Sequence, residues 1–182
     1  MPELETLDFE AMYAAFRRVK VHIGLVISEV RITGQAAHFV REPFSIKLDE
    51  PAEIEAEILQ GDVQAMLNAM KPGGLQNFSV TMDEGKVNVD ATMQMLLTVP
   101  VSAVCTLRID QGTRLFIDLE SVSVLGGAPK SMVQKQLDAI NPVFDLAQLP
   151  INGTLVSVEV SGGKALLKGH LEPKPELLNT GK

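Results

Sequence analysis

The sequence predicts an α+β fold in which a long, curved antiparallel meander sheet is wrapped on two or three helices. Apolar and polar residues alternate from Val87 to Ile109, which is the period of strands with one buried face. Two shorter segments, 61–70 and 129–141, instead space their apolar residues three and four apart, as in a helix with one buried face. Because the apolar face of an antiparallel sheet must be covered, we expect the helices to lie on it.

The N-terminal segment is predicted to be a helix followed by a strand. Residues 6–17, with Asp8 as the N-cap, place four apolar residues on one helical face: Phe9, Met12, Tyr13 and Phe16. From Val19 the period is two, and it then shifts by one residue. Such a shift turns the wrong side chains inward unless an extra residue absorbs it, so a β-bulge is expected near Ser28–Glu29. Gly34–Gln35 is expected to turn the chain.

The middle of the chain is predicted to alternate one short helix with several strands. The helix over 61–70 has Asp62 as its cap candidate and ends at Pro72. The segment 87–109 is expected to be one long ribbon that bends or leaves pairing at Pro100. Other strands are expected around Phe39–Leu48 with a break near Pro43, and over 54–58, 78–82 and 115–119.

The C-terminal part is predicted to hold a helix and a strand pair. Pro129 suits the first turn of a helix over 129–141. Strands follow over 155–160 and 165–167, separated by two turn glycines. Residues 1–172 are expected to form one domain, and the polar tail 173–182 is expected to be disordered.

The composition is more apolar than a chain of this size requires. Hydrophobic residues make up 46% and the mean hydropathy is +0.15, although the net charge is −7. Three explanations stay open: an apolar groove, an interface with a partner, and a rich core. The acidity argues against nucleic acid as a partner. No export signal precedes Asp8, and polar residues and a proline interrupt the longest apolar region, so a cytoplasmic location is expected, or an envelope location if a leader was removed.

Catalytic and metal-binding patterns are missing from the sequence. The three histidines, His22, His38 and His170, lie far apart, and no metal-ligand or nucleophile motif occurs. We therefore expect no catalytic residue, no metal, no cofactor and no enzymatic activity. Cys105 lies in an alternating strand, where a buried, inert thiol is expected. The acidic residues between Asp49 and Glu57 are interpreted as the solvated face of a strand.

The eight methionines allow two interpretations. Met66 and Met70 share one helix face, and Met93 and Met95 share one strand face. Methionine fills irregular gaps in a core, but flexible thioethers can also line a groove that accepts varied ligands. Both interpretations stay open from the residues alone.

The stretch from Gly61 to Gly169 resembles the LmeA-like phospholipid-binding family, a group of bacterial proteins. The similarity lies in a pattern of short segments rather than in a catalytic motif. Its closing part is the most specific. The segments are Asp62-Val63-Gln64-Ala65-Met66-Leu67, Ala128-Pro129 through Gln136-Leu137, Leu149-Pro150-Ile151-Asn152-Gly153-Thr154-Leu155, Val158-Glu159-Val160 and Leu166-Leu167-Lys168-Gly169.

The resemblance implies a relative of the tubular lipid-binding (TULIP) proteins, in which a curved sheet wraps a helix and leaves an apolar groove. It implies a phospholipid or another apolar small molecule as the ligand, with transient membrane contact. The alternative is a structural module that buries its apolar face against a partner or in a homodimer. Ligand would lie between helix and sheet residues, which are Met66, Met70, Val89, Met93, Met95, Leu107, Leu115, Ile117, Val133 and Leu137.

Overall fold

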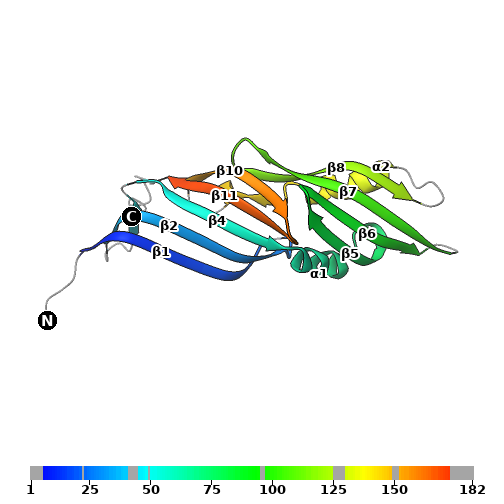
Figure 1. The fold of residues 1–182 in the computed structure, drawn as a ribbon, viewed down its shortest axis with the longest axis horizontal. Helices are drawn as coiled ribbons and strands as arrows, with labels where there is room; N and C mark the ends of the chain where they lie inside the picture. The colour runs from blue at the N-terminus through cyan, green and yellow to red at the C-terminus, as the bar shows by residue number, and fades with distance from the viewer. Residues whose placement is uncertain are drawn as a thin grey trace, which may run out of the picture.

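The protein consists of two antiparallel sheets placed end to end in an elongated molecule, with two helices beside the second sheet (Figure 1). The computed structural model describes residues 6–21, 23–40, 45–48, 50–94, 97–124, 130–148 and 152–172. Within these residues, no helix is long and apolar enough to cross a membrane. The α+β prediction of curled antiparallel sheet with helices is confirmed.

The first sheet has six strands in the order β1-β2-β4-β11-β10, with β3 beside the end of β2. It is not a simple meander, because β11 comes from the C-terminal end of the chain and inserts between β4 and β10. The register pairs Ile54 with Gly169 and Ile58 with Ala165. The strands are β1 (Thr6–Lys20), β2 (Val26–Val40), β3 (Ser45–Leu48), β4 (Ala52–Leu59), β10 (Asn152–Ser161) and β11 (Lys164–Glu172).

The second sheet is a true meander of five strands in the order β5-β6-β7-β8-β9. Helix α1 (Gln60–Met70) and the short 3-10 turn η1 (Pro72–Gly74) lead into it from β4, and helix α2 (Lys130–Ile140) follows β8. A second 3-10 turn, η2 (Leu146–Gln148), follows β9. The strands are β5 (Leu75–Asp83), β6 (Lys86–Gln94), β7 (Thr98–Asp110), β8 (Arg114–Val124) and β9 (Phe144–Asp145).

The two sheets share one apolar core. Its largest cluster combines Val80, Met82 and Val87 of the second sheet with Ala165 and Leu167 of the first. Backbone hydrogen bonds join the turns of the two sheets, with Gly163 N–H donating to Met82 O at 2.8 Å and Gly85 N–H donating to Val160 O at 2.8 Å. The apolar surplus of the sequence is therefore used partly to join the sheets.

The predicted helix over 6–17 is wrong, because these residues form β1 and pair with β2 along nearly its whole length. The aromatic residues of this segment have the spacing of a helical face only by coincidence. In a strand, Tyr13 and Phe16 point to opposite faces, and both are exposed, at 67% and 52%. Long-range pairing with β2 decides the conformation here, and local periodicity does not contain that information.

The predicted bulge near Ser28–Glu29 and the turn at Gly34–Gln35 are also wrong. The register is constant on both sides of Ser28, from Arg17–Glu29 to Val19–Ile27, so no residue is inserted. The irregularity lies instead in the opposite strand, where Arg18 has a positive φ of 56°. β2 continues straight through Gly34, which is buried and pairs with Met12.

The predicted long ribbon over 87–109 is two strands of a hairpin. β6 ends at Gln94, which pairs with Thr98 at the start of β7. Pro100 lies within β7, where it stands opposite Thr92 of β6. On its other side it has no partner, because the pairing of β7 with β8 ends at Val101. A proline is tolerated at this position because no neighbouring strand on the β8 side requires a backbone N–H from it.

The two helices and the strand pair at the C-terminal end are confirmed as predicted. The Asp62 cap is wrong, because the residue before α1 is Leu59 and no side chain caps the helix. Instead, the Oδ1 atom of Asp62 lies 3.9 Å from Nη1 of Arg18. The prediction for the tail 173–182 lies outside the described residues, as do Pro129 and His22.

Candidate functional site

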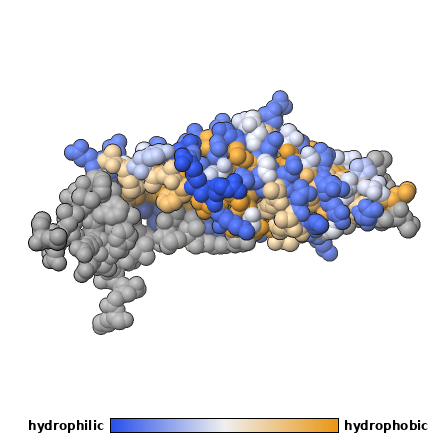
Figure 2. Space-filling model, turned by 90° about the horizontal axis from the view of Figure 1, so that it is seen from below, coloured by the Kyte–Doolittle hydropathy of each residue, from blue (hydrophilic) through white to orange (hydrophobic). Residues whose placement is uncertain are grey.

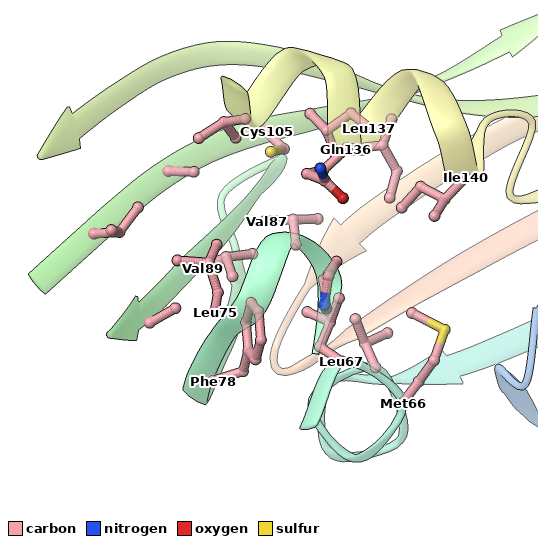
Figure 3. A pocket seen from close by; sticks show the side chains of 17 residues that line it. Met66, Leu67, Leu75, Phe78, Val87, Val89, Cys105, Gln136, Leu137 and Ile140 are labelled. Atoms are coloured by element: carbon pink, nitrogen blue, oxygen red, sulfur yellow. The ribbon is translucent and has the colours of Figure 1, made fainter. Parts of the chain in front are cut away.

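An apolar cavity of about 100 Å³ lies between α1, α2 and the inner face of the second sheet (Figure 3). Val63, Met66 and Leu67 line it from α1, and Val133, Gln136, Leu137 and Ile140 line it from α2. Pro72 and residues of four strands complete the wall, which are Leu75 and Phe78 of β5, Val87, Val89 and Ala91 of β6, Val101, Ala103 and Cys105 of β7 and Ile117 of β8.

The cavity exists because small side chains stand opposite medium-sized ones on two neighbouring strands. The register of β6 and β7 pairs Val87 with Cys105, Val89 with Ala103 and Ala91 with Val101. All six side chains point to the same face and line the cavity below the helices. The sheet therefore contributes a shallow apolar floor.

Helix α1 is held against the edge of β5 by a row of amide side chains. Gln60, Gln64 and Asn68 stand four residues apart on one face of the helix. They accept hydrogen bonds from backbone N–H groups of β5, at 3.1 Å from Met82, 3.1 Å from Val80 and 2.9 Å from Phe78. Asn68 also donates to the carbonyl oxygen of Phe78 at 3.0 Å. These bonds satisfy the strand edge and fix α1 as a rigid wall.

In the described residues, the side-chain hydrogen bonds between the α2 segment and the sheet come from Asn141, the residue that follows α2. The Asn141 side chain accepts a hydrogen bond from Ile117 N–H at 2.9 Å and donates one to Ile117 O at 2.8 Å. Among the described side chains of α2, none is fully buried, whereas α1 buries Val63 and Met66. Low burial is a mark of elements that open at low cost, so α2 is the weaker of the two walls.

Gln136 supplies an amide group in the otherwise apolar wall. Its side chain points from α2 into the space between the two helices (Figure 3). A Cβ atom at Gly73 would lie 3.3 Å from Gln136 Cδ, and Gly73 has a positive φ of 63°. Glycine at this position therefore provides both the backbone conformation and the close approach of η1 to the amide.

The lining contains no Asp, Glu, Lys, Arg or His among the described residues, and no group of metal-ligating side chains occurs in them. Cys105 is 3% exposed, and burial raises the pKa of its thiol to about 11. The predicted buried thiol is confirmed. The wall can exclude water and bind apolar groups, but it offers no general base or charged nucleophile at neutral pH.

Alkylation of Cys105 tests this environment. Because the thiolate is the reacting form, a rise in pKa of about two units should slow the reaction with iodoacetamide at pH 8 about a hundredfold relative to the urea-unfolded chain. The rate in the folded protein should increase as the pH rises from 8 towards 10. Mass spectrometry of timed samples measures both effects, and equal rates in the folded and unfolded chain would contradict a buried thiol.

The predicted ligand-binding residues are divided between the cavity and its surroundings. Met66, Val89, Ile117, Val133 and Leu137 line the cavity. The other described residues do not line it. Met70 is 43% exposed, and Met93 packs behind the lining, against Leu75 and Phe78. Leu107 packs on the main core, and Leu115 lies within that core at 1% exposure. Met95 lies outside the described residues.

Several lining residues were missed, although the alternating pattern contained them. Val87, Ala91, Val101, Ala103 and Cys105 have the same parity as Val89 in the sequence. Their side chains are small or medium-sized, and a cavity forms where side chains are small, so residue size does not mark them as ligand contacts. Phe78, Gln136 and Ile140 lie on predicted elements, and Gln136 and Ile140 belong to the inner stripe expected for the helix over 129–141, but none of the three was predicted to bind ligand.

The acidic stretch before α1 lies away from the cavity and is solvated, as predicted. Glu53 is exposed, Glu55 accepts a hydrogen bond from Arg31 at 3.0 Å, and Glu57 accepts one from Lys164 at 2.8 Å. β4 lies inside the sheet, so these acids find bases on both neighbouring strands. Cross-strand pairing explains why they lie on the outer face without repelling one another.

The chain matches a model of a known protein family. A family model described as LmeA-like phospholipid-binding matches residues 8–170, which is nearly the whole chain. No curated protein and no solved structure matches the chain. The match includes both helices and all four strands of the cavity wall. The chain therefore belongs to the LmeA-like phospholipid-binding family.

Proposed function

We propose that the protein binds an acyl chain of a phospholipid in the cavity between α1, α2 and the second sheet, without catalysing a reaction. The observation that supports this most directly is a wall of apolar side chains from both helices and four strands, interrupted by a single amide. Such a wall favours a ligand by removing apolar area from water, at about 25 cal/mol per Å². Membership of the family supports lipid as the class of ligand.

Gln136 gives the ligand a direction in this proposal. An amide can donate to and accept from a polar group, such as the ester of a phospholipid, while the acyl chain lies on the floor made by β6 and β7. Apolar pockets commonly use a small number of polar groups for orientation. The absence of charged lining residues among those described means that the head group would lie outside the cavity.

Ligand entry requires the cavity to enlarge. Its volume of about 100 Å³ is below the roughly 300–1,000 Å³ of pockets that hold drug-sized ligands. We propose that α2 moves outward to admit the acyl chain and turns about its attachment at Asn141. The low burial of α2 and the firm attachment of α1 to β5 support this division between a moving and a fixed wall.

Binding of a phospholipid with a fluorescent acyl chain tests the proposal. The sequence contains no Trp, so the signal comes from the ligand alone. We expect saturable binding with one ligand per chain and displacement by unlabelled phospholipid. Absence of saturable binding, or binding that unlabelled phospholipid does not displace, would contradict it.

Contact with a membrane would let the cavity take up lipid, and the β6–β7 hairpin is the candidate contact. Leu97 follows β6 at this hairpin and is 78% exposed, the largest exposure among the exposed large hydrophobic side chains of the described residues. The sequence from Ala91 to Leu107 has no charged residue. An uncharged hairpin with an exposed leucine can enter the interface of a bilayer at low cost.

Leu97→Asp should slow the uptake of fluorescent phospholipid from neutral phosphatidylcholine vesicles several-fold, because a charge at the tip opposes entry into the interface. Uptake from detergent micelles should stay unchanged, since the cavity is intact. Val156→Asp is a matched control, because Val156 is also exposed, at 60%, but lies in the other sheet. Equal slowing by both variants would argue against a role for the hairpin.

An assembly module that buries apolar surface against a second copy remains the second candidate. The observations that favour it are the small volume of the cavity and the exposed aromatic residues Tyr13 and Phe16 of β1. The two proposals are compatible, because β1 and the cavity lie in different sheets.

A further inference from the structure

The outer edge of β1 differs from the other sheet edges. β1 pairs with β2 on one side, and within the described part of the chain its other side has no strand and no recorded backbone hydrogen bond. Three of the other edges, those of β5, β8 and β10, have hydrogen-bond partners in the described residues. Amides of α1 bind the edge of β5, and Asn141 binds the edge of β8 beyond β9. Leu155 N–H of β10 donates to Gly112 O at 2.6 Å.

An uncovered strand edge is normally protected by short length, charged side chains or proline. β1 is 15 residues long, and its central residues 11–16 contain no charge, no glycine and no proline. Tyr13 and Phe16 are exposed in this stretch. Apolar patches are exposed on the face seen in Figure 2, the side on which β1 lies in Figure 1. The strand thus has the features of a pairing site.

The charges at the two ends of β1 indicate what it pairs with. Asp8 and Glu10 precede the uncharged centre, whereas Arg17, Arg18 and Lys20 follow it. A strand that is acidic at one end and basic at the other is complementary to itself when two copies run antiparallel. Parallel pairing would place like charges side by side, which is unfavourable.

We propose that β1 pairs antiparallel with β1 of a second copy of this chain, which joins the two first sheets edge to edge about a twofold axis at Ala14. Opposite residues in an antiparallel pair point to the same face, so the register must pair residues of equal parity. With the axis at Ala14, Met12 stands opposite Phe16 and Glu10 stands opposite Arg18. The twofold symmetry uses each β1 once and closes the assembly as a dimer.

The side chains of β1 fit this register. Phe16 and Met12 point to the same face in each copy, where they form two equivalent apolar pairs across the axis. Arg18 is exposed, and its Nη1 lies 3.9 Å from Asp62 Oδ1 of its own chain, so it has only a weak partner to exchange for Glu10 of the second copy. The positive φ of 56° at Arg18 interrupts the extended backbone of β1, so this contact is made by the long guanidinium side chain and not by a continued strand ladder. Arg17 already pairs with Glu29 at 3.2 Å and is not needed.

Sedimentation velocity of the purified chain and of two charge variants tests the proposal. We expect a dimer for the unmodified chain. Glu10→Arg and Arg18→Glu should each weaken it about tenfold, because each places like charges at both symmetric contacts. A mixture of the two variants should restore the dimer, since both contacts are then of opposite charge.

Tyr13→Lys/Phe16→Lys should abolish the dimer while circular dichroism stays unchanged, whereas Val156→Lys on β10 should not affect it. Binding of fluorescent phospholipid should be the same in all these variants, so the dimer and the cavity are tested separately. A monomeric unmodified chain, or a mixture of the charge variants that is no more dimeric than either alone, would overturn the proposal.

Discussion

Leu137→Asp should reduce the affinity for a fluorescent phospholipid at least tenfold. Leu137 lines the cavity from α2 and is only half-buried, so its replacement leaves little unfilled core. A carboxylate at this position, on the wall that faces Leu67 and Phe78, would have to lose water when an acyl chain enters. Desolvation of an unpaired charge costs several kcal/mol. This exceeds the free energy of about 1.4 kcal/mol that corresponds to a tenfold loss of affinity.

Ala139→Asp provides the matched control, because Ala139 is exposed on the same helix and does not line the cavity. It introduces the same charged residue into the same helix as Leu137→Asp. We expect its affinity to equal that of the unmodified chain in the same titration. Equal loss of affinity in both variants would show that charge on α2, rather than the cavity, controls binding.

The pair Leu115→Ala and Ile117→Ala should separate the core from the cavity on a single strand. Leu115 is 1% exposed in the main core, so Leu115→Ala should lower the free energy of unfolding by about 2–5 kcal/mol. Ile117 lines the cavity and is only partly buried, so Ile117→Ala should lower it by roughly 1–2 kcal/mol.

For ligand binding, the order of the two variants should be the opposite of their order in stability: Ile117→Ala should have the larger effect. Ile117→Ala changes the wall and should alter the affinity for phospholipid, whereas Leu115→Ala should bind as the unmodified chain does under conditions in which it is folded. Urea unfolding followed by circular dichroism gives the first quantity, and the fluorescence titration gives the second. A larger change of affinity in Leu115→Ala would place the ligand elsewhere.

The sequence predicts those elements whose pattern is local. α1 and α2 follow from apolar residues spaced three and four apart, and β6 and β7 follow from strict alternation. The alternating pattern does not reveal the hairpin between β6 and β7, for a geometric reason. Three residues separate Gln94 from its partner Thr98, so odd-numbered residues face inward on both strands and the alternation continues without a break.

β1 could not be predicted because its conformation depends on pairing with another strand, β2, which follows it in the chain. Its aromatic residues fit a helix by spacing, and only pairing with β2 selects the extended form. Only part of the cavity could be predicted, because the rest also depends on contacts between separate elements. Parity identifies which face of β6 and β7 is inward, but whether Ala91 and Ala103 leave a space depends on how α1 and α2 pack above them.

Native mass spectrometry of the purified protein, followed by organic extraction, tests most directly whether the cavity holds phospholipid. We predict an added mass of several hundred daltons per chain that extracts as phospholipid and is lost in Leu137→Asp but retained in Ala139→Asp. A protein without added mass that also takes up no phospholipid when it is supplied in vesicles or micelles would contradict the claim.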